Sequence, residues 1–116
     1  MRLNKIQKTA VTALQDIKAR DITVLDVRKL TSLCDTLIIA TAESTRQVKA
    51  LAQHVREALK AAGASIIGVE GEQTGEWVLV DAGDIVVHIM QPATRSYYNL
   101  EELWTPLPTR RRKTAA

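Results

Sequence analysis

Aromatic residues and cysteine are the scarcest side chains in this 116-residue sequence. Phenylalanine is absent, and the only aromatic residues are two tryptophans and two tyrosines, all between positions 77 and 104. The single cysteine, Cys34, cannot form a disulfide within the chain. This excludes the small, cross-linked scaffolds that are typical of secreted proteins.

Long hydrophobic runs are also missing. The longest apolar stretches, such as "TLIIATA" and "DIVVHIM", are far shorter than the roughly 18 residues that a membrane-spanning helix needs. The N-terminal "MRLNKIQKTA" has no apolar region of the kind found in signal peptides. We therefore expect a cytoplasmic protein with no membrane partner.

Motifs of catalysis and of metal binding are absent as well. Cys34, His54 and His88 are widely separated and do not follow a zinc-ligand spacing. Ser44 lies directly before an amphipathic segment and is better explained as a helix cap than as a nucleophile. The glycines of "GVEGEQTG" lead into a strand and lie among acids, which does not suit a phosphate-binding loop. We expect no cofactor.

One carboxylate pair keeps an enzymatic alternative open. Asp81 and Asp84 are spaced like metal-binding carboxylates. The same two residues flank the tip of a predicted hairpin, where aspartate is a favoured turn residue. The pair is therefore a weak indication of metal chemistry.

Charge is unevenly distributed along the chain, although the net charge is only +3. Residues 1–63 have an excess of five positive charges, whereas residues 64–104 contain seven acids and one base, Arg95. The basic cluster "RRRK" belongs to the final segment, and we predict that residues 108–116 form a disordered basic tail. Such a tail can make weak, non-specific contacts with RNA, while the acidic half favours a basic partner.

Hydrophobic periodicity predicts two long helices. Residues 4–18 and 45–62 both have apolar side chains at helical spacing. Asn4 and Ser44 are suited to cap the two N-termini, and Gly63 is suited to end the second helix.

The remaining apolar segments predict a sheet. Strands are expected at residues 21–27, 34–42, 64–71, 76–81 and 84–91. The last two strands are joined by the tight turn "AGD" and should form a hairpin, and a short helix is expected over 94–104. Helix 45–62 should act as a crossover between parallel strands. The fold class is therefore an α/β sandwich: one domain over residues 1–107, with a mixed five-stranded sheet, two main helices and a short C-terminal helix.

The two hairpin strands are apolar on both faces, so the sheet must be covered on both sides. If both long helices pack on one face, the short helix can cover only part of the other. An apolar, aromatic surface rimmed by acids would then remain for a partner. The alternative places the two long helices on opposite faces, which makes all of these residues ordinary core.

The candidate partner-binding residues are those expected on or around the second face. They are Glu70, Trp77, Leu79, Asp81, Asp84, His88, Met90, Tyr97 and Tyr98. For His88, which lies in the middle of a strand, a hydrogen-bonded structural role is favoured over that of a catalytic base.

Three stretches resemble a known family. These are "DITVLDVRKLTSLCDTLIIATAESTRQVKAL", "VEGEQTGEWVLVDAGDIVVHIM" and "TRSYYNLEELW". The pattern E-G-x-x-x-G-x-W-x-x-x-D-x-G-D-x-V-V-H and the following R-x-Y-Y-x-L-E-x-L-W are both intact. In these motifs the chain is similar to the ribosomal silencing factors, also called Iojap-like proteins.

This resemblance implies a nucleotidyltransferase-like topology without that enzyme's catalytic signature. It also implies binding to the large ribosomal subunit at ribosomal protein fourteen. Small-subunit joining would be blocked and translation lowered when nutrients are short. The runner-up function is a nucleotidyl-transferring enzyme that uses Asp81 and Asp84 with magnesium. A third interpretation makes the second face a homodimer interface, which the family also implies.

Overall fold

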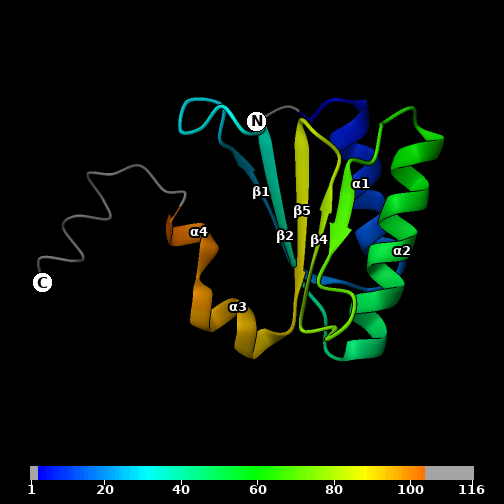
Figure 1. The fold of residues 1–116 in the computed structure, drawn as a ribbon, viewed down its shortest axis with the longest axis vertical. Coiled ribbons are helices and arrows are strands. Elements are labelled where there is room, and N and C mark those ends of the chain that lie inside the picture. The colour runs from blue at the N-terminus through cyan, green and yellow to red at the C-terminus, as the bar shows by residue number, and fades with distance from the viewer. Residues whose placement is uncertain (1–2, 104–116) are drawn as a thin grey trace, which may run out of the picture.

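The computed structural model describes residues 3–103. The elements in chain order are α1 (Lys5–Asp16), β1 (Arg20–Asp26), β2 (Thr36–Thr41), α2 (Thr45–Ala61), β3 (Gly68–Glu70), β4 (Trp77–Asp81), β5 (Ile85–Met90), α3 (Pro92–Tyr98) and α4 (Leu100–Leu103). The strands form one sheet in the order β1-β2-β5-β4-β3 (Figure 1). The predicted α/β fold with a mixed five-stranded sheet is confirmed. Residues 104–116, including the predicted tail and Trp104, lie outside the described residues.

Local capping explains where the two long helices begin. At α1 the Asn4 side chain accepts a hydrogen bond from the Gln7 amide at 2.8 Å, and the Gln7 side chain accepts one from the Asn4 amide at 2.8 Å. At α2 the Ser44 hydroxyl accepts a hydrogen bond from the Gln47 amide at 3.1 Å. Both predicted caps are confirmed. Within residues 3–103 no helix is long and apolar enough to span a membrane.

The sheet combines parallel and antiparallel pairs. Strands β2 and β5 are parallel at its centre, and the pairs β1–β2, β4–β5 and β3–β4 are antiparallel. Strand β3 therefore has the same direction as β2, as the crossover through α2 predicts. The two strands are not neighbours, because the β4–β5 hairpin is inserted between them.

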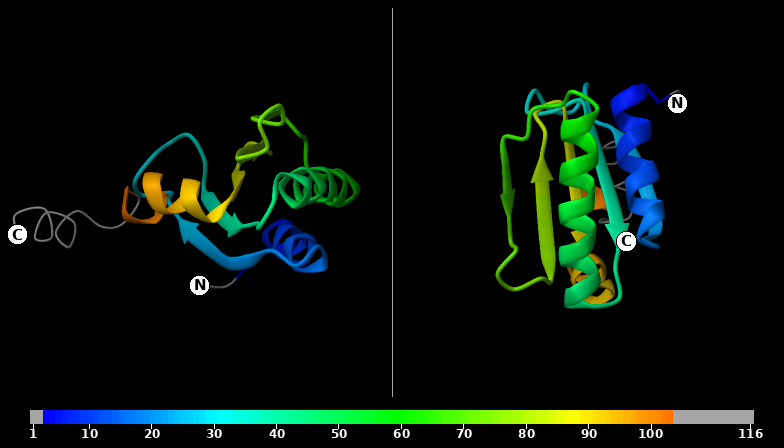
Figure 2. Two further views of the ribbon diagram at one scale, coloured as in Figure 1. Left: turned by 90° about the horizontal axis from the view of Figure 1, so that it is seen from below. Right: turned by 90° about the vertical axis from the view of Figure 1, so that its right-hand side faces the viewer.

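Both long helices cover the same face of the sheet, whereas α3 and α4 lie on the other side (Figure 2). The main core fills the space under α1 and α2. It contains Leu14, Leu51, Val55 and Leu59 from the helices, and Ile38, Val78, Val80, Val87 and Ile89 from the strands. The alternative with the long helices on opposite faces is therefore wrong. The second face has far less helix above it.

Two predicted elements differ from the structure. Strand β3 has three residues instead of eight, because its partner β4 ends at Asp81 and the chain before Ile67 has no strand to pair with. The C-terminal helix is divided at Asn99, whose φ of 47° is left-handed. Asparagine tolerates this conformation better than most residues. The first part begins already at Pro92, because the fixed φ of proline suits the first turn of a helix.

Candidate functional site

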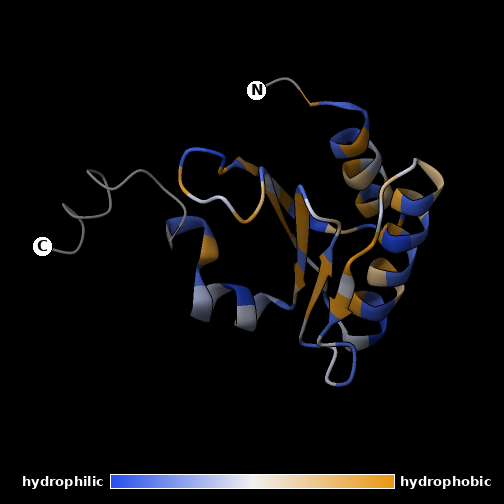
Figure 3. Cartoon of the chain, turned by 45° about the horizontal axis from the view of Figure 1, so that its top comes forward, coloured by the Kyte–Doolittle hydropathy of each residue, from blue (hydrophilic) through white to orange (hydrophobic). Residues whose placement is uncertain are grey.

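The second face of the sheet has a small buried core of its own. This core consists of Val27, Leu37, Ile39 and Met90. Leu100 of α4 packs against it, and so do the partly buried Leu25, Cys34, Trp77 and Val86. Figure 3 shows apolar residues concentrated in the strands, whereas α3 is pale or hydrophilic. The second face is thus only partly covered, as the sequence predicts.

Trp77 is the centre of an aromatic cluster on this face. Its ring centroid lies 4.8 Å from that of Tyr98, in a tilted arrangement. Tyr97 meets Tyr98 edge to face with a centroid distance of 5.0 Å. The side chains of Tyr97 and Tyr98 remain 82% and 53% exposed. The cluster therefore offers exposed aromatic area next to a half-buried tryptophan, a combination typical of interface anchors.

His88 supports Trp77 from the neighbouring strand. The indole Nε1 of Trp77 donates a hydrogen bond to Nδ1 of His88 at 2.9 Å. Nδ1 must be unprotonated to accept this bond. Burial lowers the pKa of His88 to about 4, which keeps the ring neutral at pH 7. The predicted structural, hydrogen-bonded role of His88 is confirmed.

Two glycines of the first motif allow close packing before β4, one against Trp77 and one against Thr45 of α2. Gly71 has a φ of 90°, and a Cβ atom there would lie 2.1 Å from the carbonyl oxygen of Trp77. Gly75 has a φ of 71°, and a Cβ atom there would lie 2.4 Å from the side chain of Thr45. Both positions therefore require glycine, because of their backbone conformation and of close packing.

The predicted acidic residues lie along β4, with Glu70 beside Trp77 and the two aspartates at the opposite end of the strand. Glu70 is exposed and is paired in register with Leu79, and both residues line a hollow of about 240 Å³ together with Gly71 and Trp77. Asp84 is also exposed, at the end of the β4–β5 turn. Asp81 is half-buried, and its Oδ1 accepts a hydrogen bond from the Gly83 amide at 2.9 Å.

The geometry of the aspartate pair favours a turn over a metal site. Asp81 stabilises the hairpin through the bond to Gly83, as aspartate does in many turns. Among residues 3–103, no group of three His, Cys, Asp or Glu side chains is placed to hold a metal ion. The pair therefore supplies surface charge at the β4–β5 turn, the end of the hairpin opposite to Trp77.

Met90 is the predicted site residue that does not reach the surface. It lies opposite Trp77 in the β4–β5 register and is completely buried in the small core. The side chain points to the second face as its position in the strand predicts. Met90 belongs to the buried cluster against which Trp77 and Leu100 pack, so it supports the surface from below.

Sequence reasoning missed two features that border the site. Leu30 and Leu33, in the β1–β2 loop, are 47% and 84% exposed. Next to them, Val27 and Cys34 belong to the second-face cluster. Apolar residues inside the polar turn "RKLTSL" were the available signal.

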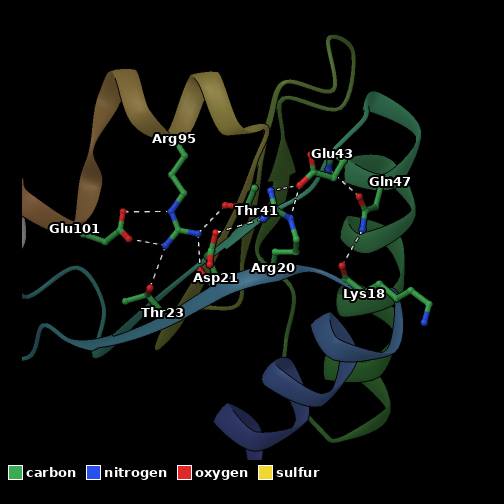
Figure 4. A network of polar contacts seen from close by, with 9 residues as sticks. All are labelled: Lys18, Arg20, Asp21, Thr23, Thr41, Glu43, Gln47, Arg95 and Glu101. Carbon is green, nitrogen blue, oxygen red and sulfur yellow. Dashed lines mark hydrogen bonds and ion pairs between the residues drawn. The ribbon is translucent and has the colours of Figure 1, made fainter.

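The second missed feature is a polar network around Arg95, which joins α3 to the sheet (Figure 4). Its guanidinium contacts Glu101 of α4, Thr41 of β2, and both Thr23 and the carbonyl of Asp21 in β1. The R-x-Y-Y-x-L-E motif contains both charged partners, which was the available signal.

With this geometry established, comparisons with known proteins identify the family. A family model described as "Ribosomal silencing factor during starvation" matches residues 1–115. The chain belongs to the ribosomal silencing factor family. The predicted family is therefore confirmed, and the match extends through most of the predicted basic tail.

Individual relatives agree with this assignment. A ribosomal silencing factor of Chromobacterium violaceum is 58% identical over 104 residues, covering 90% of this chain and 85% of the relative. A crystal structure of a Chromobacterium violaceum protein superposes with a TM-score of 0.85 at 56% identity, covering 91% of each chain. A mouse protein named "Mitochondrial assembly of ribosomal large subunit protein 1" is 35% identical, over 82% of this chain and 43% of its own length.

Membership decides between the two function classes considered for the sequence. Ribosomal silencing factors are non-enzymatic ribosome-binding proteins that repress translation, and the family implies binding to the large subunit. The nucleotidyl-transferring alternative is set aside.

Proposed function

We propose that the second face of the sheet is the surface through which this chain binds the large ribosomal subunit, with ribosomal protein fourteen as the direct contact. By occupying that position it excludes the small subunit and lowers translation when nutrients are limiting. One observation supports the location best. The aromatic cluster of Trp77, Tyr97 and Tyr98 is exposed on the sheet face that the two long helices leave uncovered.

The chemistry of this surface fits a basic protein partner. Trp77 and Leu79 provide apolar anchors, and His88 holds the indole of Trp77 in place. Glu70, Asp81 and Asp84 supply the negative rim, and all three are at least partly exposed. Complementary charge speeds association and orients the partner, whereas the aromatic residues provide most of the affinity.

Several finer features belong to the same proposal. The protein acts in the cytoplasm, and residues 108–116 form an accessory tail that contacts ribosomal RNA weakly. A homodimer through the second face would compete with subunit binding, because one apolar surface cannot contact two partners at once. The nucleotidyltransferase-like topology implied by the family resemblance remains a prediction, and superposition of the sheet on nucleotidyltransferase structures tests it.

Sedimentation with separated ribosomal subunits tests the main proposal. We expect the protein to pellet with large subunits and not with small ones, and to reduce the joining of the two when both are present. Equal distribution between the subunits, or failure to pellet with either, would contradict it. Sedimentation velocity of the protein alone, with and without large subunits, tests whether a dimer forms and whether subunit binding removes it.

A further inference from the structure

We propose that Arg95 is the positioning residue of the binding surface: it clamps α3 and α4 onto β1 and β2, and so fixes where Tyr97 and Tyr98 lie. This inference rests on the proposed function for its binding consequence. Its structural part, the attachment of α3 and α4, is independent of any partner.

Apart from Arg95, helix α3 is held to the sheet through the ring contact of Tyr98 with Trp77. None of its seven residues is buried. A helix of two turns without an apolar face has no stability of its own in water, since helices need tertiary packing of that kind. Of the residues that follow it, Leu100 packs on the small second-face core. The position of α3 therefore depends more on polar contacts than the positions of α1 and α2 do.

The guanidinium of Arg95 is largely removed from solvent, with its side chain 11% exposed. Nη2 donates to Glu101 Oε2 at 2.5 Å and to Thr23 Oγ1 at 3.0 Å. Nη1 donates to the Asp21 carbonyl oxygen at 2.6 Å and to Thr41 Oγ1 at 2.8 Å. One planar fork thus joins α3, α4, β1 and β2 (Figure 4). A lysine carries a single compact ammonium group instead of a planar fork of N–H donors, so it could not make this set of hydrogen bonds.

The sheet is shaped to receive this side chain. Strand β1 changes register against β2 between Arg20 and Thr23, and Asp21 within this bulge has a φ of 50°. A bulge leaves backbone groups outside the regular ladder. The Asp21 carbonyl is such a group. It accepts a hydrogen bond from Arg95, which lies 74 positions later in the chain.

The clamp acts on the aromatic cluster through short connections. Tyr97 and Tyr98 lie two and three residues after Arg95 on the same helix, and Tyr98 contacts the ring of Trp77. The Asn99 amide donates to the Arg95 carbonyl oxygen at 2.8 Å, which sets the joint to α4. Glu101 of α4 also contacts the guanidinium, and its hydrogen bond with Arg95 lowers the pKa of the Glu101 carboxyl. Release of Arg95 would free the tyrosines from Trp77.

The test compares Arg95→Met with Arg28→Met. Arg28 also forms an ion pair, with Asp26 at 2.8 Å, but its side chain is exposed and neither residue of this pair belongs to α3 or α4 or accepts a hydrogen bond from Arg95. Both variants are prepared in a Trp104→Phe background, so that Trp77 is the only tryptophan. Three properties are measured: amide hydrogen exchange of α3 and of the main-core strands, Trp77 fluorescence, and large-subunit binding.

For Arg95→Met we expect faster exchange in α3, unchanged exchange in β2 and β5, and altered Trp77 fluorescence. Subunit binding should weaken about tenfold or more. Arg95→Lys keeps the charge but not the fork, and should fall between the wild type and Arg95→Met. Arg28→Met should change none of the three properties.

Two results would overturn the inference. One is wild-type exchange in α3 of Arg95→Met. The other is uniformly faster exchange across the whole sheet in both Arg95 variants, which would mean a general contribution to stability. If the wild-type protein does not bind large subunits, the proposed function fails, and the exchange and fluorescence measurements still decide whether Arg95 is the clamp.

Discussion

The two faces of the sheet are held together by different physical means. Under α1 and α2, a continuous apolar core includes buried residues from both helices and from the three strands β2, β4 and β5. On the second face, a four-residue core is joined by a tryptophan–histidine hydrogen bond, tilted and edge-to-face ring contacts and one largely buried arginine. The first face gives the protein its stability. The second face is held by hydrogen bonds and ring contacts, which fix the positions of exposed side chains but bury less apolar area.

The first prediction compares the truncation of one leucine on each face of the sheet. Leu51→Ala, in the fully buried core under α2, should lower the free energy of unfolding by about 3 kcal/mol or more, because it leaves a cavity. Leu79→Ala on the second face should lower it by about 1 kcal/mol, since Leu79 is only half-buried. Urea denaturation measures both. Equal losses would show that the second face is also an ordinary core.

The second prediction concerns Trp77. Trp77→Ala should weaken large-subunit binding by about 2 kcal/mol, or about thirtyfold, because it removes the central anchor. The free energy of unfolding should fall by less, about 1 kcal/mol, since the ring is only half-buried. Binding assays beside thermal melting separate the two effects.

Trp77→Phe serves as the control for the ring itself. It keeps an aromatic side chain next to Tyr98 and removes only the donor to His88. We expect binding between that of the wild type and that of Trp77→Ala. A Trp77→Ala protein that unfolds, or that binds as tightly as the wild type, would move the contact surface away from this face.

The third prediction uses the titration of His88. Its pKa is about 4 in the folded protein, below the usual value near 6.5 for an unfolded chain. As the pH falls, the unfolded state therefore binds a proton at His88 before the folded state does. The contribution of His88 to the free energy of unfolding is fully present above pH 6.5 and is lost as the pH approaches 4. We expect a loss of roughly 2 kcal/mol from this group between those values, since it is partly exposed.

Denaturation at several pH values, with His88→Gln as the control, measures this effect. Glutamine retains an acceptor for the Trp77 indole but does not titrate, so the variant should lack the His88 part of the pH dependence. Identical pH profiles of the two proteins would show that His88 is not the group responsible.

The fourth prediction reverses one charge on each face. Asp84→Lys should weaken binding of a basic partner by about 1 kcal/mol, mainly through slower association, and should barely change the melting temperature because Asp84 is exposed. Glu57→Lys makes the same change on the exposed side of α2 and should leave binding almost unaltered. A larger effect of Glu57→Lys would place the contact on the helix side.

The smallest effect is expected for the tail. Deletion of residues 108–116 removes "RRRK" and should leave the melting temperature and subunit selectivity unchanged. Weak binding to unrelated RNA should fall, most clearly at low salt, since such contacts are electrostatic. Loss of large-subunit binding on deletion would show that the tail is part of the main interface.

The local features of this fold could be predicted because their causes are local. Asn4 and Ser44 cap helices through bonds to residues three positions away. The alternation in β4 and β5 correctly assigned Val78 to one face and Trp77 to the other, since strand geometry has a period of two. Family membership followed from two motifs, the first of which contains Gly71 and Gly75 at positions where the backbone and close packing require glycine.

The rest was decided by contacts between distant segments. Only the tertiary structure shows that α1 and α2 share one face, that Met90 is buried in the small second-face core, and that β3 begins opposite Asp81, where β4 ends. Arg95 reaches Asp21 and Thr23 across more than seventy residues, which no periodicity indicates. The sequence by itself determined which elements form and which side chains share a face, because those depend on neighbours in the chain. Which faces pack together depends on all the elements at once. Only this packing left the second face of the sheet half covered.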